Sequence, residues 1–412
     1  MDHPTSRGAC PTLASPMPVV DGLLARFRPV TGFSAAQVDA LARAAGAYGN
    51  GRIEVTARGS VQVRGLSART EVAFREALDL AGIAAKTGIV IELSPVAGED
   101  PGEIRDPRPL ASMVEAVCTQ ALERAPLAPK LSIVIEGGGQ VRLDAHKADI
   151  RLTAFAEGWA MAVGGRDTGL LSEAAVPDAV ADVLRQLQAM GPRARGSDVA
   201  KGARSAASPL TSMGEREAST HRVEPLSIQL KDGRTALRIT LPYGQVLASR
   251  LSGLAAFMEA HGVAEARPAP GRTLALMGAC EGLSPALAAL GFAAGALTLC
   301  SGAEAGDGGI IHAADLARAW DEAATDLSDG SFHLHVSTCV KGCAYGGRPG
   351  IVLSGAHLML YGEREQKPFA SLDPAAIETG LVSLADRIRN SRRSGETVLE
   401  CLKRNDAIRL YP

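Results

Sequence analysis

Three of the seven cysteines lie at spacings that suit a metal centre. Cys339 and Cys343 form a Cys-x3-Cys pair in a glycine-containing turn, directly after the strand-like segment FHLHVST. Thiolates at the end of a strand can converge on iron or zinc without straining the backbone. Two cysteines supply half of a four-ligand site, and Cys300, which ends the apolar segment AGALTLC, is the best third ligand. The alternative is that the pair is merely small and buried, as isolated cysteines commonly are; its place in a turn beside Lys341 favours the metal.

The other candidate ligands carry weaker signals. His333 and His335 share one face of the same strand by period two and can ligate a metal, but hydrogen bonding on a polar sheet face is their commoner role. Cys118 and Cys401 lie in helical patterns and are expected in the core. Cys10 lies in a proline-rich segment whose pattern indicates no role for it. No P-loop, complete dinucleotide-binding glycine motif or nucleophile elbow is present in the sequence.

Arginines recur on one face of a strictly alternating segment. From Arg52 to Gly65 the even positions are polar and the odd positions apolar or glycine, which predicts one half-buried antiparallel strand, bent at Gly59. Arg26 and Arg28 share a face of the preceding segment LLARFRPV. The even positions include Arg58, Gln62 and Arg64. This surface is either an ordinary solvated sheet face or a wall that binds several carboxylates, because the arginine fork matches carboxylate geometry. Alternation alone favours the solvated face.

The elements that carry these residues occur twice along the chain. A helical segment that begins near residue 35 has a counterpart 213 positions later, and the two helices end in Gly49 and Gly262. The following segments each reach Gly-Leu-Ser, at Gly65 and Gly282, which would raise the offset to 217 through small insertions. A longer helix and further strands then follow in both halves, LSIVIEGGG and DIRLTAFAEGWAMAVGG early, FHLHVSTC and GIVLSGAHLMLYGE late. Four successive elements in the same order favour a duplication over chance similarity of alanine-rich helices.

The duplication predicts an α+β protein with mixed sheets flanked by helices. We expect a first small half-domain at 8–95 and a first larger module at 96–190. The second half-domain is expected at 223–295, and the second module, with the cysteine motif, at 296–412. Residues 191–222 are rich in Gly, Ser, Ala and charge without a sustained apolar period, so we expect a flexible linker there.

Composition excludes several functional classes. The formal net charge is −2 and aromatic residues make up 4%, so neither a basic surface nor stacking platforms for nucleic acid are expected. No apolar stretch reaches the roughly 18 residues of a transmembrane helix, so no membrane partner is expected. The first residues lack the basic-then-apolar pattern of a secretory signal, and seven cysteines in a long chain favour metal or redox chemistry over disulfides. A cytoplasmic location follows as the expectation.

These features together resemble the sulfite and nitrite reductase superfamily over nearly the whole chain. Residues 56–58 (Thr-Ala-Arg) with Gln62 resemble the family's Thr-x-Arg strand, whose arginine faces the anionic ligands. Lys130 matches the first lysine of the family's Pro-x-Lys-Phe-Lys strand, whereas Ser132 stands at the second, which weakens a sulfite or nitrite reductase function. The resemblance implies a pseudo-two-fold architecture of duplicated ferredoxin-like half-domains and larger modules that carry a cluster and a tetrapyrrole.

Within that superfamily the chain is similar to the short members, the precorrin-3B synthases. The similarity lies in the opening GACPTLASPMPVVDGLLARFRPV, in ARPAPGR ending at Arg272, in VSTCVKGCAYG and in the length. It implies a monooxygenase of aerobic cobalamin synthesis that hydroxylates precorrin-3A with dioxygen and closes a lactone from a ring-A acetate. It also implies a 4Fe–4S cluster, a mononuclear non-haem iron and no siroheme. NADH would act through an electron-donor reductase, because the chain shows no NADH fingerprint of its own.

The resemblance assigns roles to the residues singled out above. The many carboxylates of a precorrin give the arginines a purpose, which moves the carboxylate-binding interpretation ahead of the solvated one. The implied substrate-binding residues are Arg26, Arg28, Arg58, Gln62, Arg64, Lys130 and Arg272. The implied cluster ligands are Cys300, Cys339 and Cys343.

One cluster position departs from the family pattern. The family has Cys-x5-Cys before the Cys-x3-Cys pair, and Gly306 stands where the second of these cysteines would fall after Cys300. Asp307 and Cys280 are equal candidates for the fourth ligand, and otherwise the cluster is altered or absent. Two alternatives therefore stay open, a siroheme-dependent sulfite or nitrite reductase and a non-catalytic tetrapyrrole-binding protein.

Overall fold

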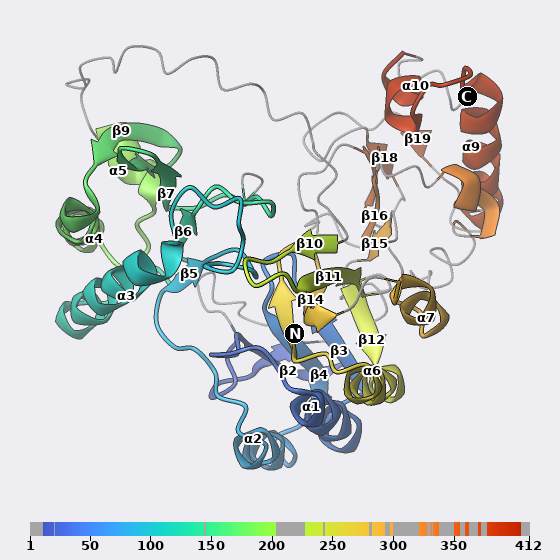
Figure 1. Ribbon diagram of the computed structural model, residues 1–412, viewed down its shortest axis with the longest axis horizontal. Coiled ribbons are helices and arrows are strands. Elements are labelled where there is room, and N and C mark those ends of the chain that lie inside the picture. Colours follow the sequence, from blue (N-terminus) through green and yellow to red (C-terminus); the bar gives the residue numbers. More distant parts are fainter. Residues whose placement is uncertain are drawn as a thin grey trace, which may run out of the picture.

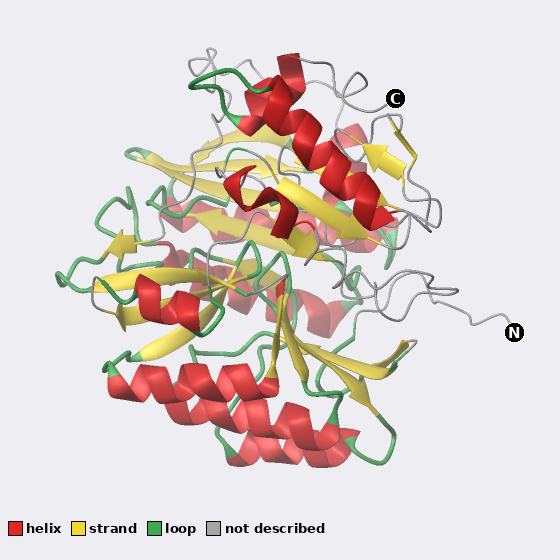
Figure 2. Ribbon diagram, turned by 90° about the vertical axis from the view of Figure 1, so that its right-hand side faces the viewer, coloured by secondary structure: helices red, strands yellow, loops and turns green. Residues whose placement is uncertain are grey.

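The computed structural model is an α+β protein whose described elements divide into two halves of the same design (Figure 1). The structure describes residues 11–19, 21–143, 146–202, 227–241, 244–279, 282–292, 297–299, 320, 322–327, 331, 333–337, 350–354, 359–361, 370–371 and 377–404. In Figure 1 the sheets of two half-domains lie centrally above their helices, and a larger module lies on either side. In Figure 2 the strands form layers with helices above and below them.

The first half-domain is an antiparallel sheet packed on two helices. Its strands are β1 (Met17–Val19), β2 (Gly22–Phe27), β3 (Arg52–Val55) and β4 (Val61–Leu66), in the order β1-β2-β4-β3. Helix α1 (Ala35–Tyr48) begins at a capping box, in which Ser34 Oγ accepts from the Gln37 N–H and Gln37 Oε1 accepts from the Ser34 N–H. Helix α2 (Glu71–Leu80) packs beside α1, and the apolar inner face of the sheet joins both in one core.

The second half-domain repeats this plan. Its elements are β10 (Ser227–Gln229), β11 (Thr235–Thr240), β12 (Gln245–Leu247), α6 (Ala248–Ala260), β13 (Glu265–Ala269), β14 (Thr273–Ala279) and α7 (Ser284–Ala289). The sheet order is β10-β11-β14-β13, and the register between β11 and β14 shifts at the same place as that between β2 and β4. Helix α6 packs against α1, and one apolar core contains residues of both half-domains. The predicted duplication is therefore confirmed.

Each half-domain contributes a strand segment to the other. Val246 of β12 pairs with Ile53 of β3, so β12 extends the first sheet. In the second half-domain Ala266 of β13 pairs with Phe33, which precedes α1. Val246 lies 213 positions after Phe33, and Ala266 lies 213 positions after Ile53. The two pairings are therefore equivalent, and a pseudo-two-fold axis relates the half-domains.

The alternating segment 52–65 is a hairpin, so the prediction of one bent strand is wrong. Val55 of β3 pairs with Val61 of β4, and the chain reverses over residues 56–60. Gly59 allows this reversal because it has a φ of 75°, a left-handed conformation that favours glycine. Period-two alternation continues in phase through the turn, which hides the turn in the sequence.

The repeat offset does not grow to 217 within the hairpin. The register of β13 with β14 matches that of β3 with β4 at a constant shift of 213 residues. Gly65 therefore corresponds to Gly278 rather than to Gly282, and both have left-handed φ angles, 71° and 75°. The shared Gly-Leu-Ser letters mark different structural positions.

The first larger module is a mixed sheet with helices on one face. Its elements are β5 (Val90–Glu92), α3 (Pro107–Arg124), β6 (Ser132–Glu136), β7 (Ile150–Phe155), β8 (Gly158–Val163), β9 (Arg166–Leu171), η1 (Glu173–Ala175), α4 (Val176–Met190) and α5 (Gly196–Gly202). Strands β5, β6 and β7 are parallel, and β8 and β9 continue antiparallel. Cys118 of α3 lies in the core as predicted, and burial raises its pKa to about 12, so the thiol stays protonated.

The second larger module has the same sheet topology. Its described elements are β15 (Leu297–Leu299), η3 (Thr325–Leu327), β16 (His333–Ser337), β17 (Gly350–Ser354), β18 (Met359–Tyr361), β19 (Ala370–Ser371), α9 (Ile377–Ser391) and α10 (Val398–Arg404). Again three parallel strands are followed by two antiparallel ones. Cys401 of α10 is buried, as predicted. His333 and His335 lie in β16, but their side chains are outside the described part.

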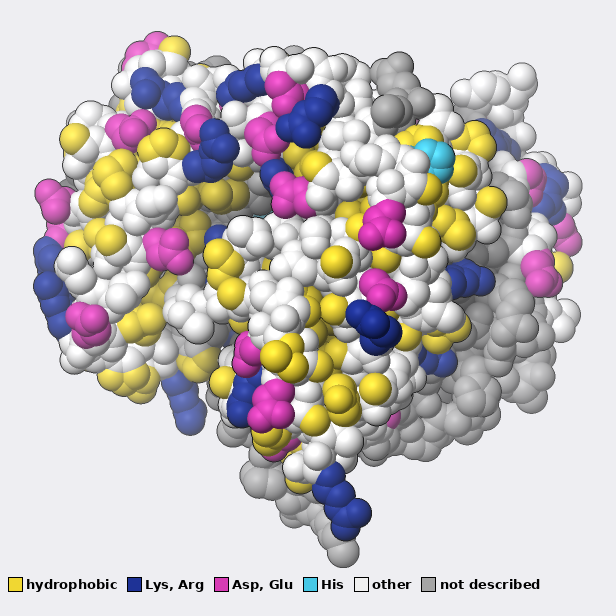
Figure 3. Space-filling view, turned by 60° about the horizontal axis from the view of Figure 1, so that its bottom comes forward, with side chains coloured by type: hydrophobic (Ala, Val, Ile, Leu, Met, Phe, Trp, Pro, Cys, Tyr) yellow, Lys and Arg dark blue, Asp and Glu magenta, His cyan; other side chains and the backbone are white. Residues whose placement is uncertain are grey.

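Ordered structure continues into the segment that we predicted as a linker. Helix α5 lies within 191–222, and Arg195 just before it binds Asp149 through two hydrogen bonds of 2.8 and 2.9 Å. No helix among the described residues is long and apolar enough to span a membrane. On the face seen in Figure 3, charged groups of both signs are interspersed with apolar side chains, which does not favour a polyanion there.

Candidate functional site

The outer face of the first half-domain sheet carries a row of linked polar side chains. Arg26 Nε of β2 donates to Gln62 Oε1 of β4 at 2.6 Å, and Gln62 Nε2 donates to Glu54 Oε2 of β3 at 2.5 Å. The register places the three residues side by side on adjacent strands. Gln62 is 3% and Glu54 1% exposed. We predicted a polar face that is either solvated or free to bind carboxylates, whereas Gln62 and Glu54 are buried and the polar groups of this face hold one another.

Arg64 lies on the same face but binds a carboxylate of the protein itself. Its Nε and Nη2 atoms donate to the two oxygens of Asp21, in the turn between β1 and β2, at 3.0 and 2.8 Å. This bidentate pair fixes the guanidinium plane. Because the Arg64 side chain is 9% exposed, Asp21 would compete with any substrate carboxylate for it.

Arg28 and Arg58 converge on Glu92, the last residue of β5 in the neighbouring module. Arg58 Nη1 donates to Glu92 Oε1 at 2.9 Å, and Arg28 Nη2 lies 3.4 Å from the same oxygen. Arg28 Nη2 also donates to the Arg58 carbonyl at 2.6 Å. Arg58 Nη2 donates to the Lys147 carbonyl at 2.6 Å. The hairpin turn is therefore fastened to the first module through two arginines and one carboxylate.

The charges in this cluster do not balance. Burial would raise the pKa of Glu92, but the hydrogen bond from His146 and the charges of Arg28 and Arg58 hold that pKa below its ordinary value. Burial lowers the pKa of the Arg28 guanidinium, with Glu92 acting against that effect. Two charged arginines face one ionised carboxylate, so one positive charge of the guanidinium pair is left uncompensated. An anion that approached Arg58, whose side chain is 40% exposed, would compensate it.

His146 completes the cluster. Its Nδ1 atom lies 2.7 Å from Glu92 Oε2, and the ring is 14% exposed. An ionised carboxylate only accepts hydrogen bonds, so Nδ1 must carry the hydrogen. In the neutral imidazole Nε2 is then an acceptor. The sequence predicted neither Glu92 nor His146, because Glu92 ends an ordinary apolar strand and His146 lies alone in a loop.

The structure does not bring Lys130 to this cluster. Lys130 is exposed in the turn before β6, and none of the contacts among the described residues joins it to Arg58 or Glu92. Ser132, at the second lysine position of the family motif, is 1% exposed, and its N–H donates to Asp149 Oδ2 at 3.0 Å. A serine buried beside the Asp149–Arg195 ion pair cannot take the place of a substrate-facing lysine.

Arg272 lies where the hairpin turns of the two half-domains meet. Gly271 N–H donates to the Ala57 carbonyl at 2.9 Å, and Arg58 pairs with Pro270. Arg272 has a φ of 64° and is 7% exposed, and no other described non-glycine residue has a positive φ. Its counterpart 213 positions earlier is Gly59. The second repeat thus keeps an arginine where the backbone favours glycine, and such strain often marks a functional position.

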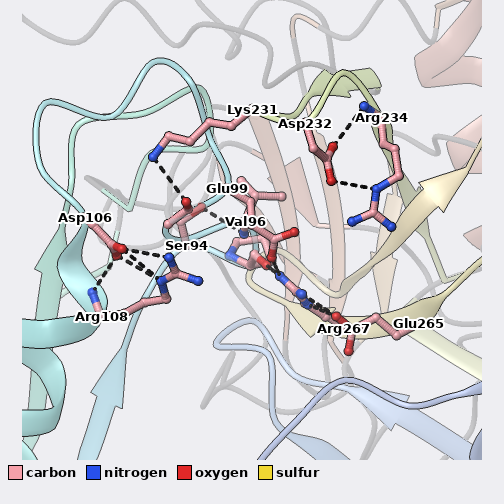
Figure 4. A network of polar contacts seen from close by, with 12 residues as sticks. Ser94, Val96, Glu99, Asp106, Arg108, Lys231, Asp232, Arg234, Glu265 and Arg267 are labelled. Atoms are coloured by element: carbon pink, nitrogen blue, oxygen red, sulfur yellow. Dashed lines mark hydrogen bonds and ion pairs between the residues drawn. The ribbon is translucent and has the colours of Figure 1, made fainter.

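The corresponding outer face of the second half-domain is closed by the first module. A small apolar cluster joins Val96 and Val141 of that module to residues of β10, β11 and β14. Beside it, Arg267 Nη1 donates to Glu99 Oε1 at 2.7 Å (Figure 4). Lys231 Nζ lies 3.4 Å from Glu103 Oε2. Of the two equivalent faces that the duplication creates, this one is covered by an apolar cluster and by ion pairs within the protein. The first half-domain presents the 40% exposed Arg58 side chain, so it is the better anion site.

The predicted cluster ligands lie outside the described residues. This applies to Cys300, Cys339 and Cys343 and to the alternatives Asp307 and Cys280. The part of the chain that the structure describes contains no group of three or more side chains suited to a metal ion. The three motif cysteines do supply thiolates, the donor type that iron–sulfur clusters take. That donor chemistry agrees with the sequence motif, and their geometry stays a prediction.

Comparisons with known proteins place this architecture. Residues 17–85 match the model of the nitrite/sulfite reductase ferredoxin-like half domain. The chain is 34% identical over 429 aligned residues to a precorrin-3B synthase from Sinorhizobium sp, with 98% of this chain and 94% of the relative covered. The solved structure of Mycobacterium tuberculosis NirA is similar with a TM-score of 0.65 at 17% identity, covering 94% of this chain and 85% of the other. The last similarity concerns the fold.

Proposed function

The chain belongs to the precorrin-3B synthase family, on the nitrite and sulfite reductase fold, and from this premise we propose that it hydroxylates precorrin-3A and closes a lactone. In this reaction one atom of dioxygen enters the macrocycle and the other leaves as water. Two electrons come from NADH through a separate reductase. The reaction belongs to aerobic cobalamin biosynthesis and would take place in the cytoplasm.

The observation that supports a precorrin most directly is the uncompensated positive charge of the Glu92 cluster. Two of the five guanidinium N–H groups of Arg58 are engaged by Glu92 and the Lys147 carbonyl, which leaves donors for a carboxylate from outside. A precorrin presents many carboxylates on a rigid ring, so several arginines can hold one substrate in a defined orientation. In this proposal Arg58 binds a carboxylate directly, whereas Arg26, Arg28 and Gln62 keep the surrounding face in place.

The remaining candidate residues would bind carboxylates less directly than Arg58. Arg272, in a strained backbone two residues after Pro270, is 7% exposed, so it would bind a second carboxylate from the other half-domain only by moving out of its buried position. Lys130 would bind a carboxylate only at the edge of the module, and Arg64 only in competition with Asp21. We propose no acid–base residue for the oxygen chemistry.

For the electrons we propose a 4Fe–4S cluster held by Cys300, Cys339 and Cys343, with Asp307 or Cys280 as the fourth ligand. Such a cluster, when bound, supplies single electrons to oxygen chemistry. A mononuclear non-haem iron completes the proposed cofactors, and no siroheme is proposed. The buried Ser132 in place of a lysine argues against the alternative sulfite or nitrite reductase. The glycine at position 306 favours the other alternative, a non-catalytic tetrapyrrole-binding protein.

The experiment is a turnover assay under air. Anaerobically purified protein, with its iron and sulfide content measured, is mixed with precorrin-3A, NADH and a reductase. We expect a product heavier by one oxygen atom, with the label of ¹⁸O₂ incorporated. Siroheme absorbance in the purified protein, or tight precorrin binding by iron-free protein without turnover, would overturn the proposal in favour of one of the two alternatives.

A further inference from the structure

The Glu92 carboxylate has a geometry suited to aligning Arg58. It is 1% exposed, so it cannot contact a bulky substrate itself. One of its oxygens binds Arg58, and the other is bound by His146. With both oxygens engaged, the carboxylate cannot rotate freely, and the guanidinium that it holds shares its orientation.

Arg28 and the module loop complete this alignment. Arg28 donates to the Arg58 carbonyl and pairs with Glu92. It therefore fixes both the backbone of Arg58 and the carboxylate that holds the Arg58 side chain. The Lys147 carbonyl accepts from Arg58 Nη2, and Lys147 directly follows His146 in the chain. The Arg58 side chain, though 40% exposed, is thus held at two nitrogen atoms by groups from another module.

We infer that Glu92, oriented by His146, is a positioning residue that sets the guanidinium of Arg58 for a substrate carboxylate. This inference rests on the proposed function, because it takes Arg58 as the residue that binds the carboxylate. A fixed arginine binds more tightly than a mobile one, since less side-chain freedom is lost on binding. The positioning effect opposes the charge effect of Glu92, because a negative group beside the site repels an anion.

The positioning effect and the charge effect predict opposite changes in anion affinity when Glu92 is substituted. Glu92→Gln removes the negative charge while keeping a side chain of the same size. If Glu92 acted only through its charge, the substitution would tighten the binding of an anionic tetrapyrrole. If Glu92 positions Arg58, the same substitution weakens binding despite the gain in positive charge.

The experiment measures the dissociation constant of uroporphyrin III, a stable octacarboxylate tetrapyrrole, for the full chain. We expect Arg58→Ala to weaken binding about 20-fold and Glu92→Gln about 5-fold, since a hydrogen bond to a charged group contributes factors of this order. In the double variant the losses should not multiply. Arg58→Ala should cost less than about 4-fold once Glu92 is Gln, because an unpositioned arginine has little left to lose.

Matched variants separate positioning from general damage. Glu103 is a buried carboxylate of the same module that pairs with Lys231 rather than with Arg58, so Glu103→Gln should leave uroporphyrin binding unchanged. Glu92→Asp, which keeps the charge on a shorter side chain, should bind between the wild type and Glu92→Gln. Thermal unfolding of each variant identifies any that fails to fold, and Glu92→Asp then carries the comparison.

The outcomes distinguish the two proposals. If Arg58→Ala binds uroporphyrin as the wild type does, the carboxylate site of the proposed function is wrong, and the positioning role is wrong with it. If Arg58→Ala weakens binding while Glu92→Gln tightens it or multiplies independently with Arg58→Ala, only the positioning role is overturned.

Discussion

Ser252 Oγ donates a 2.7 Å hydrogen bond to Asp39 Oδ1, and the two residues are 213 positions apart. That separation equals the offset between α1 and α6, so the bonded residues occupy the same position in the two copies. In a two-fold arrangement only residues beside the axis meet their own counterparts. The axis therefore passes between these helices, and it passes again through the hairpin turns where Gly271 meets Ala57.

This contact at the axis should contribute measurably to stability. Ser252→Ala removes a hydrogen bond to a carboxylate, and we expect it to lower the free energy of unfolding by about 1 kcal/mol. In a double-mutant cycle with Asp39→Ala, most of that loss should disappear, as urea unfolding of the four proteins would reveal. Additive losses would contradict a direct bond across the axis.

The strained backbone at Arg272 gives a prediction with an unusual sign. At a φ of 64°, glycine is favoured over alanine, so Arg272→Gly should be more stable than Arg272→Ala by about 1 kcal/mol. Both variants lose the same side chain beyond Cβ, which leaves the backbone as the difference. At Arg267, in the middle of β13, the order should reverse because glycine weakens a strand. Equal stability of the two Arg272 variants would contradict the strain.

Stability should depend on pH through Glu92. Its pKa is lower in the folded protein than in the unfolded chain, so its contribution is complete above the ordinary value of 4.5 and is lost as the pH falls through the folded value. Glu92→Gln lacks this contribution, and at pH 7 we expect it to be less stable by about 3 kcal/mol. Below pH 4.5 the difference between the two proteins should shrink in chemical denaturation. A difference that stays constant with pH would show that the ionised form is not the stabilising one.

The proposed cluster ligands can be tested through metal content. Cys343→Ser should lower bound iron and labile sulfide by most of their wild-type amounts, because serine is a poor ligand for a cluster. Cys118→Ala is the control, since that thiol is buried in α3 and protonated. It should keep the iron and lose about 1 kcal/mol of stability. Wild-type iron in purified Cys343→Ser would remove this cysteine from the ligand set.

The duplication could be predicted from the sequence because its evidence consists of local patterns. Helix length and the terminal glycines Gly49 and Gly262 repeat with little change, and the structure places both at the end of equivalent helices. The hairpin turn was not predicted because its five residues keep the alternation of the flanking strands in phase. The Gly-Leu-Ser alignment misled because identical short motifs need not share a register.

The site was predictable only in part, since its partners come from distant segments. Arg58 stood out through its spacing and through a family resemblance. Glu92 lies 34 positions from Arg58, and His146 lies 54 positions from Glu92, so no local pattern links them. Arg64 looked equivalent to Arg58 by alternation, yet its neighbour in space is Asp21, which sequence periodicity cannot reveal.

The most direct test of the account is the affinity of uroporphyrin III for wild type, Arg58→Ala and Arg234→Ala. Arg234 is an exposed arginine that pairs with Asp232 at the turn between β10 and β11, far in sequence from the cluster. We expect Arg58→Ala to weaken binding by a factor of about 10 to 100, the range for a charge-assisted hydrogen bond, and Arg234→Ala to bind like the wild type. Equal affinity of all three proteins, each folded, would contradict the carboxylate site on the first half-domain.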